Sequence, residues 1–301
     1  MNRIHLILIA LFSFCLHMAA QETELEQDMF ETMREGDKAV VVAVHVGAED
    51  ATSQQRIDRF NTRIHQAYPS YDFREAWTSR SLIRQKNSNG VNYMPTPDEL
   101  FTQLRKDGYT HVLIQSSDIV EGADMRFLRY TVDAARTHFK QVRLGDPLLN
   151  DAADYEKALH ATVSAYGSTK EANVLMCTNL LGTHASQYTM LDYTLHDKDM
   201  KGWYVGAVGG YPSAESVIKR LRNEKVKKVH LIPFLFTASN QSTMDMAREW
   251  TNLLQSAGCK VTTEMHCLGD IDAIIDIFVS HIQHAEKFHK YSPKELKLIN
   301  R

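Results

Sequence analysis

Short apolar runs alternate with longer amphipathic segments along the 301-residue chain. The run at residues 39–46, AVVVAVHV, is continuous and rich in β-branched residues, which is typical of a strand covered on both faces. The segment after it places Ile57, Phe60 and Ile64 at helical spacing. Strands that alternate with helices form parallel sheets joined by right-handed crossovers. The sequence therefore predicts an α/β fold.

The same alternation occurs in both halves of the chain. Further strands are predicted at residues 72–79, 110–116, 141–144, 173–176, 203–208, 228–236 and 259–265. Helices are predicted at residues 57–68, 82–85, 97–107, 123–138, 155–166, 213–224, 243–257 and 271–287, with a short N-terminal helix within 21–38. We expect two domains, residues 21–168 and 169–290, each with a mostly parallel sheet flanked by helices, and a tail at 291–301. A cleft is expected between the strand ends of the two domains.

The first twenty residues are typical of a secretory signal. Arg3 is followed by the apolar run 4–16 and by Met18-Ala19-Ala20, which offers small residues for cleavage. The run is shorter than the about 20 residues that span a bilayer. We therefore predict cleavage near Ala20 and export to the periplasm or the outer-membrane surface. An uncleaved anchor is the alternative, and a lipid-anchored Cys15 is poorly supported because Phe14 precedes it.

Charge and cysteine content narrow the classes of function. The formal net charge is −3, without the clustered Lys and Arg of a nucleic-acid-binding face, so we predict no nucleic-acid partner. The predicted mature chain keeps Cys177, Cys259 and Cys267, an odd number that leaves at least one thiol unpaired within the chain. A Cys259–Cys267 bridge is one option. No cysteine spacing matches a zinc site.

The stretch 173–193, NVLMCTNLLGTHASQYTMLDY, holds the predicted site. A short apolar strand ends at Cys177, Thr178 and Asn179, and apolar residues at helical spacing resume at Tyr188. Junctions of this kind line the ligand crevice of open α/β sheets. Hydrogen-bonding side chains gather here and before the predicted helix 243–257; they are Thr178, Asn179, Ser239, Asn240 and Gln241.

Six stretches resemble one family in order and spacing. They are AVVVAVHVG, FREAWTSRSLIRQ, TPDELFTQLRKDGYTHVLIQS, RLGDPLLNDAADYEKAL, VGAVGGYP and VHLIPFLFTASNQSTMDMA. Together they are similar to the anaerobic sirohydrochlorin cobaltochelatases of the class II chelatase group, over roughly residues 39–285. The resemblance implies two chelatase-like domains with a tetrapyrrole cleft between them.

The positions that carry metal chemistry in that family are substituted here. The resemblance places a family histidine at Thr178, a family glutamate at Gly209 and a second histidine at Gln241; a first-domain histidine appears as Asp118. Divalent transition metals prefer imidazole or carboxylate ligands. Thr178 and Gln241 also cannot act as general bases near neutral pH. These substitutions speak against ordinary metal insertion, although they leave tetrapyrrole binding open.

The resemblance extends to exported haem-binding members of the group in haem-scavenging anaerobes. It implies a haem or related metallotetrapyrrole ligand, a role in iron acquisition and an outer-membrane transporter as partner. The alternative is an active chelatase, for sirohydrochlorin or for haem demetallation, that uses displaced ligands such as His45 and His184. A binding protein for another small molecule is a more distant reading.

Individual residues have both functional and structural interpretations. His45 and His184 are candidate axial ligands of haem iron. The structural alternative for His45 is a histidine packed at a strand end, and the one for His184 is a solvated histidine at a helix start. Tyr211 is a candidate stacking surface beside the Gly209-Gly210 turn. Four methionines could fill the core or contact the haem; they are Met176, Met190, Met244 and Met246. Three arginines could pair with the haem propionates or be surface charges; they are Arg74, Arg80 and Arg84. Three further histidines are expected to be solvated; they are His281, His284 and His289.

Overall fold

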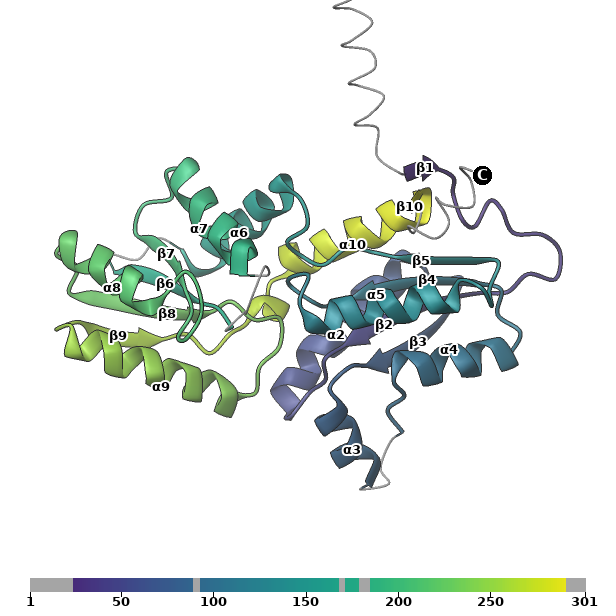
Figure 1. Cartoon of the computed structure of the whole chain (residues 1–301), viewed down its shortest axis with the longest axis horizontal. Coiled ribbons are helices and arrows are strands. Elements are labelled where there is room, and N and C mark those ends of the chain that lie inside the picture. The colour runs from purple at the N-terminus through teal and green to yellow at the C-terminus, as the bar shows by residue number, and fades with distance from the viewer. Residues whose placement is uncertain (1–23, 89–92, 168–170, 179–184, 291–301) are drawn as a thin grey trace, which may run out of the picture.

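Two four-stranded parallel sheets organise the computed structural model, which describes residues 24–88, 93–167, 171–178 and 185–290 (Figure 1). The first sheet has the order β3-β2-β4-β5 and the second β7-β6-β8-β9. The strands of the first are β2 (Ala39–His45), β3 (Asp72–Trp77), β4 (His111–Ser116) and β5 (Gln141–Leu144). Those of the second are β6 (Ala172–Met176), β7 (Trp203–Gly206), β8 (Lys228–Pro233) and β9 (Lys260–Thr263). The predicted α/β fold is confirmed.

Helices cover both sheets and follow the alternation expected from the sequence. Before the second sheet come α2 (Ala51–Ala67), α3 (Arg80–Ser88), α4 (Pro97–Lys106), α5 (Ala123–Ala135) and α6 (Ala152–Tyr166). Then follow α7 (Ala185–Asp197), α8 (Ala214–Asn223), α9 (Asn240–Ser256), the 3₁₀ turn η2 (Leu268–Asp270) and α10 (Asp272–Lys287). In the part of the chain that the structure describes, no helix has both the length and the apolar character to cross a membrane.

The predicted helix within residues 21–38 is wrong for its described part. Residues 24–26 form strand β1 (Glu24–Glu26), which pairs antiparallel with β10 (Phe288–Lys290), and turns follow it. The backbone N–H groups of Gln27 and Met29 donate to carbonyls at the end of α10, so they take no part in a local helix. Met29 is fully buried, and its apolar contact is with the core rather than with a helical neighbour.

Helix α10 packs against the first sheet, although it follows the second in sequence. It contacts β4, β5, α2 and α6, and in Figure 1 it runs from the second half back across the first. His281 is buried, with its Nε2 3.1 Å from an Asp154 carboxylate oxygen, and His289 is buried as well. The prediction that these two histidines are solvated is therefore wrong. The boundary predicted at residues 168–169 falls between β5 and β6 in sequence, and α10, which follows it, contacts elements of the first sheet.

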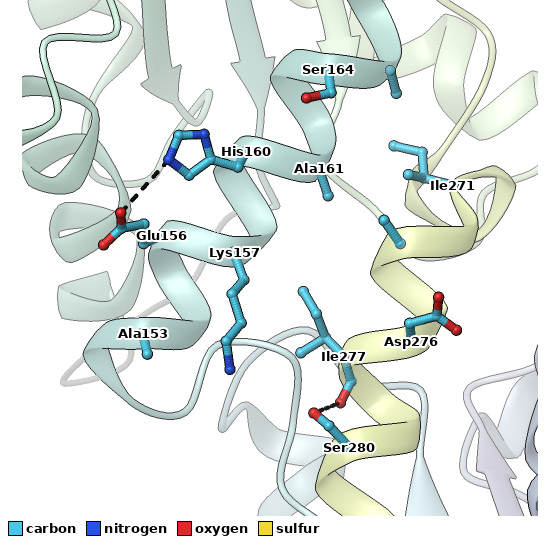
Figure 2. Close-up of a pocket in the computed structure, with 12 residues that line it drawn as sticks. Ala153, Glu156, Lys157, His160, Ala161, Ser164, Ile271, Asp276, Ile277 and Ser280 are labelled. Atoms are coloured by element: carbon cyan, nitrogen blue, oxygen red, sulfur yellow. Dashed lines mark hydrogen bonds and ion pairs between the residues drawn. The ribbon is translucent and has the colours of Figure 1, made fainter.

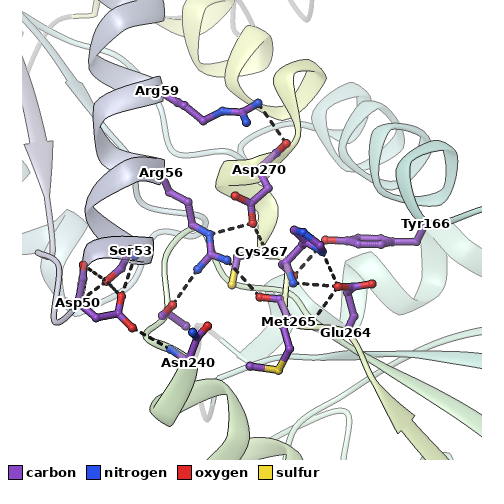
Figure 3. Close-up of polar contacts among 12 residues, drawn as sticks. Asp50, Ser53, Arg56, Arg59, Tyr166, Asn240, Glu264, Met265, Cys267 and Asp270 are labelled. Carbon is purple, nitrogen blue, oxygen red and sulfur yellow. Dashed lines mark hydrogen bonds and ion pairs between the residues drawn. The ribbon is translucent and has the colours of Figure 1, made fainter.

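A buried arginine joins the two halves (Figure 3). The Arg56 guanidinium on α2 donates to the Asp270 carboxylate at 2.8 Å, to the Ala238 carbonyl at 2.8 Å and to the Met265 carbonyl at 3.1 Å. Only 2 % of this side chain is exposed. Each of the three guanidinium nitrogens thus donates to an acceptor of the second half, and such hydrogen bonds compensate for burying the charge.

Three aromatic rings extend this junction into the core. Phe60 of α2, Phe236 after β8 and Phe278 of α10 are buried, and their ring centroids lie 5.3–5.5 Å apart. All three pairs have the edge-to-face geometry that aromatic quadrupoles favour. The core therefore runs without interruption from one sheet to the other.

The three cysteines of the predicted mature chain are free and buried. Cys259 and Cys267 do not form the bridge considered from the sequence. Burial raises the pKa of the Cys177 and Cys267 thiols, so neither is a reactive thiolate near neutral pH.

Candidate functional site

A cleft of about 470 Å³ lies where the carboxyl ends of both sheets meet. Its lining comes from the segments that follow β2, β4, β6 and β8, together with Leu82 of α3 and Tyr188 of α7. These are the central strands of the two sheets, so the cleft occupies the crevice that strand ends form in open α/β folds. The location predicted from the sequence agrees with the observed one.

Apolar side chains and carboxylates make up most of the lining. The apolar residues are Val46, Leu82, Ile119, Val120, Leu235 and Phe236. The ionisable lining residues other than Tyr188 are Glu49, Asp118 and Asp124. Among the described residues that line it, none is Lys, Arg, His, Cys or Met. The cleft thus offers apolar surface and negative charge.

Glu49 belongs to a polar contact between the two halves. Its carboxylate accepts hydrogen bonds from the hydroxyls of Ser239 at 2.5 Å and Ser242 at 3.0 Å. The neighbouring Asp50 accepts from the backbone N–H of Asn240 at 3.1 Å, and it also caps α2 through Ser53. These hydrogen bonds therefore connect the N-termini of α2 and α9 beside the cleft. Ser239, predicted as a donor for a ligand, uses its hydroxyl to join the halves, whereas Asn240 joins them through its backbone N–H.

Asp118 is an acid that titrates near neutrality in this cleft. The hydroxyl of Ser116 donates to its carboxylate, and its own backbone N–H donates to Ser116 Oγ at 3.1 Å. Burial, with smaller contributions from the carboxylates of Asp124 and Glu121, raises the pKa of Asp118 to about 7. A carboxyl group with this pKa can donate or accept a proton at physiological pH. The family histidine position thus keeps a group suited to proton transfer.

His45 ends β2 but points into the protein. Its Nδ1 lies 2.9 Å from Ser117 Oγ and its Nε2 lies 2.9 Å from Asn61 Oδ1. Burial lowers the pKa of His45 to about 4, so the ring is neutral. Since the Asn61 oxygen can only accept, Nε2 carries the proton and the Ser117 hydroxyl donates to Nδ1. His45 offers iron no free nitrogen here, and the axial role predicted for it requires breaking one of these bonds.

Of the positions that the resemblance assigns to family metal ligands, some line the cleft and others lie outside it. Thr178 lines the cleft, and its hydroxyl lies 3.1 Å from the Tyr188 hydroxyl. Gln241 is exposed at the start of α9 and donates to Asp245 at 3.0 Å. Gly209 has a φ of 69° in the loop between β7 and α8, where Tyr211 is exposed. Neither Gln241, Gly209 nor Tyr211 is among the lining residues.

Two predicted site residues, Asn179 and His184, lie outside the described residues.

The predicted methionines differ in burial. Met176 is buried in the core of the second sheet and Met246 packs against that core, whereas Met190 and Met244 are exposed. Arg74 donates to the Tyr109 hydroxyl at the outer edge of the first sheet.

Sequence reasoning missed Glu49, Ser117 and Asp124 as cleft residues. Ser117 directly follows the central strand β4, and Glu49 lies four residues after the end of β2, so their place in the loops after these strands was the signal that could have found them.

A larger cavity of about 950 Å³ lies away from the strand ends, between α6 and α10 (Figure 2). It is an open groove with apolar residues such as Ala161 and Ile277. Its rim carboxylate Glu156 is already paired with Lys198 at 2.8 Å and His160 at 3.7 Å. Since its polar groups do not converge on one point, we assign the site to the cleft at the strand ends.

Comparisons with known proteins agree with this architecture. The chain is 28 % identical over 257 residues to the sirohydrochlorin cobaltochelatase of Salmonella typhimurium strain LT2, covering 82 % of this chain and 96 % of that protein. It is 26 % identical over 254 residues to sirohydrochlorin cobaltochelatase CbiKC of Nitratidesulfovibrio vulgaris strain Hildenborough, covering 81 % and 89 %.

Solved structures share the fold at low sequence identity. SirB from Bacillus subtilis with Fe3+ superposes with a TM-score of 0.57 at 14 % identity, over 83 % of this chain and 96 % of that one. DR2241 from Deinococcus radiodurans, described as similar to chelatases with two additional domains, gives 0.55 at 11 % identity, over 87 % and 59 %. The sequence profile described as Cobalt chelatase (CbiK) matches residues 38–287. The chain therefore belongs to the CbiK cobalt chelatase family.

Proposed function

We propose that the protein is an exported tetrapyrrole-binding protein that captures haem for iron acquisition. The observation that carries this proposal is the chemistry at the family's metal positions, which are Thr178, Gly209 and Gln241. Hydroxyl, hydrogen and amide are poor ligands for a free divalent transition metal. A preformed metallotetrapyrrole needs no site for a free ion, because its macrocycle already holds the metal. The family's tetrapyrrole cleft then remains useful without the family's ion site.

The described cleft fits the flat, apolar faces of such a ligand. Its apolar residues come from both halves, so a planar ring between them would contact Ile119 and Val120 on one side and Leu235 and Phe236 on the other. Burial raises the pKa of the Tyr188 phenol, so it stays protonated and is a poor iron ligand. His184 therefore remains our predicted axial ligand; it directly precedes α7, the helix that carries Tyr188.

Export and a transporter partner belong to the same proposal. Residues 1–20 have the sequence pattern of a secretory signal, and we propose that the mature protein acts in the periplasm or at the outer-membrane surface. There it would pass haem to an outer-membrane transporter. Detection of the protein in the envelope fraction, with a mature N-terminus near Gln21, would support this location; an intact N-terminus in the cytoplasmic fraction would contradict it.

Titration of the purified mature protein with haemin should give a saturable shift of the Soret band at micromolar protein. We expect His184→Ala to change the band position and weaken binding about tenfold or more, because an iron–nitrogen bond is lost. His266→Ala, which removes an exposed histidine, is the matched control and should bind as the unmodified protein does. Absence of a saturable shift in the unmodified protein would contradict haem binding.

The raised pKa of Asp118 supports a second candidate function, that of an active chelatase or haem-demetallating enzyme. Metal insertion displaces the pyrrole protons, and metal removal returns them to the same nitrogens. A cleft acid with a pKa of about 7 can exchange those protons at neutral pH. Assays of cobalt insertion into sirohydrochlorin and of iron release from haem decide between the two candidates. Turnover that Asp118→Asn abolishes would establish the enzyme, whereas haem binding without turnover would leave the binding protein.

Haem affinity should fall by about threefold as the pH rises from about 6 to about 8. The cause is loss of the Asp118 proton, which adds a negative charge beside Asp124 and Glu121 and repels the carboxylates of haem. The stability of the fold also depends on whether Asp118 is protonated. The folded-state pKa of about 7 exceeds the ordinary value of 3.8, so the contribution of Asp118 to the free energy of unfolding falls as the pH rises between these values.

Asp118→Asn should remove the fall in haem affinity and the Asp118 part of the fall in stability, measured by haemin titration and by thermal melts across the range. Asp133→Asn, which changes an exposed carboxylate on α5, is the control and should leave both unchanged. A pH dependence of Asp118→Asn equal to that of the unmodified protein would show that another group is responsible.

A further inference from the structure

Arg80 and Phe127 form an exposed pair where α3 and α5 approach each other. The Arg80 guanidinium carbon lies 5.6 Å from the centroid of the Phe127 ring, within the range of a cation–π contact. Phe127 is 39 % exposed, so both partners of the contact reach the surface. Arg80 is exposed although it contacts the ring, so its guanidinium can still be reached by a ligand.

This pair stands at the mouth of the cleft. Leu82, two residues after Arg80, lines the cleft, and so do Ala123 and Asp124 at the start of α5. Phe127 follows Ala123 and Asp124 by four and three residues, so it lies on the same face of α5. The pair therefore borders the cleft through Phe127 of α5, with the Arg80 guanidinium stacked on its ring.

The cleft lining is acidic, whereas Arg80 at its border is a cation. Glu49, Asp118 and Asp124 line the interior, and no described lining residue is a cation. Arg80 forms no ion pair with any residue that the structure describes, and a cation in the first turn does not stabilise a helix. Neither a partner charge nor helix stability accounts for an arginine at this position.

We propose that Arg80, stacked on Phe127, binds a carboxylate side chain of the tetrapyrrole at the mouth of the cleft. This inference rests on the proposed function, since haem and sirohydrochlorin both carry carboxylate side chains. Guanidinium presents donors in a fork that matches a carboxylate, and the ring of Phe127 limits the rotamers of Arg80 before the ligand arrives. The acidic interior repels the same carboxylates. The macrocycle consequently enters with its apolar edge first and its carboxylates outward.

The experiment compares haemin with haemin dimethyl ester, in which the carboxylates are esterified, on three proteins: the unmodified mature chain, Arg80→Gln and Arg105→Gln. Arg105 is an exposed arginine of α4 outside the cleft lining, so Arg105→Gln controls for net charge. We expect Arg80→Gln to bind haemin about fivefold more weakly, the upper end for an exposed ion pair. Its affinity for the ester should equal that of the unmodified protein. Arg105→Gln should match the unmodified protein with both ligands.

The possible results test the Arg80 contact and haem binding separately. If Arg80→Gln weakens both ligands equally, or neither, the carboxylate contact at Arg80 is overturned while haem binding stands. If the unmodified protein shows no saturable Soret shift with haemin, the proposed function fails and the inference fails with it. Thermal melts of the three proteins should coincide, because both arginines are exposed, and this excludes misfolding as the cause of a weaker affinity.

Discussion

Arg56→Met should lower the free energy of unfolding by about 3–5 kcal/mol. The substitution leaves the Asp270 carboxylate without its cation and the carbonyls of Ala238 and Met265 without a donor. Asp270 retains its bond from the backbone N–H of Cys267, so the loss is a large fraction of ordinary domain stability rather than all of it. Denaturant unfolding monitored by circular dichroism measures the change.

Arg59→Met is the matched control for this prediction. Arg59 lies on the same helix and pairs with Asp272 at 2.7 Å, but both side chains are largely exposed. Exposed pairs contribute about 0.2–1 kcal/mol, so this variant should remain close to the unmodified protein. The double variant Arg56→Met/Asp270→Asn should regain part of the lost stability because no unpaired carboxylate remains. Equal losses for Arg56→Met and Arg59→Met would show that the buried pair does not join the halves as we describe.

Phe278→Ala should destabilise the protein by about 3–5 kcal/mol through the cavity that it leaves. Phe278 is fully buried and contacts both Phe60 and Phe236, which belong to different halves of the chain. Since one core spans both sheets, we expect the two halves to lose stability together in a single unfolding transition. Calorimetry and denaturant curves followed by near- and far-ultraviolet signals measure whether the transitions coincide.

Tyr193→Ala provides the comparison for aromatic truncation, because Tyr193 is 61 % exposed on α7. It should change the free energy of unfolding by less than about 0.5 kcal/mol, as surface substitutions usually do. Two separated transitions in Phe278→Ala, with only one half destabilised, would contradict the continuous core.

The sequence was sufficient to locate the strands because their apolar runs are local signals. Residues 39–45 are buried along their whole length, as the β-branched run required. The segment 24–38 was misread because the helical spacing of Met29, Phe30 and Met33 says nothing about hydrogen bonds to α10, more than 200 residues away in the chain. The burial of His281 was missed for the same reason, since only the return of α10 to the first sheet brings it to Asp154.

The site was predictable in position and less so in detail. Thr178 and Asp118 follow strands that end at the cleft, which a rule about strand ends can anticipate. The state of His45 was not predictable, because it depends on Asn61 and Ser117 from two other segments. Likewise, Ser239 and Ser242 look like free donors in sequence, and only the fold turns them toward Glu49.

The pairing of β1 with β10 brings Glu24 opposite Lys290, so the first and last described strands leave the fold at one place (Figure 1). Anything that tethers the protein through Glu24 would therefore hold Lys290 at about the same distance from the support. Labels attached at Glu24 and at Lys290 would report on the same corner of the molecule, and a peptide joining these two residues would need to close only a short gap.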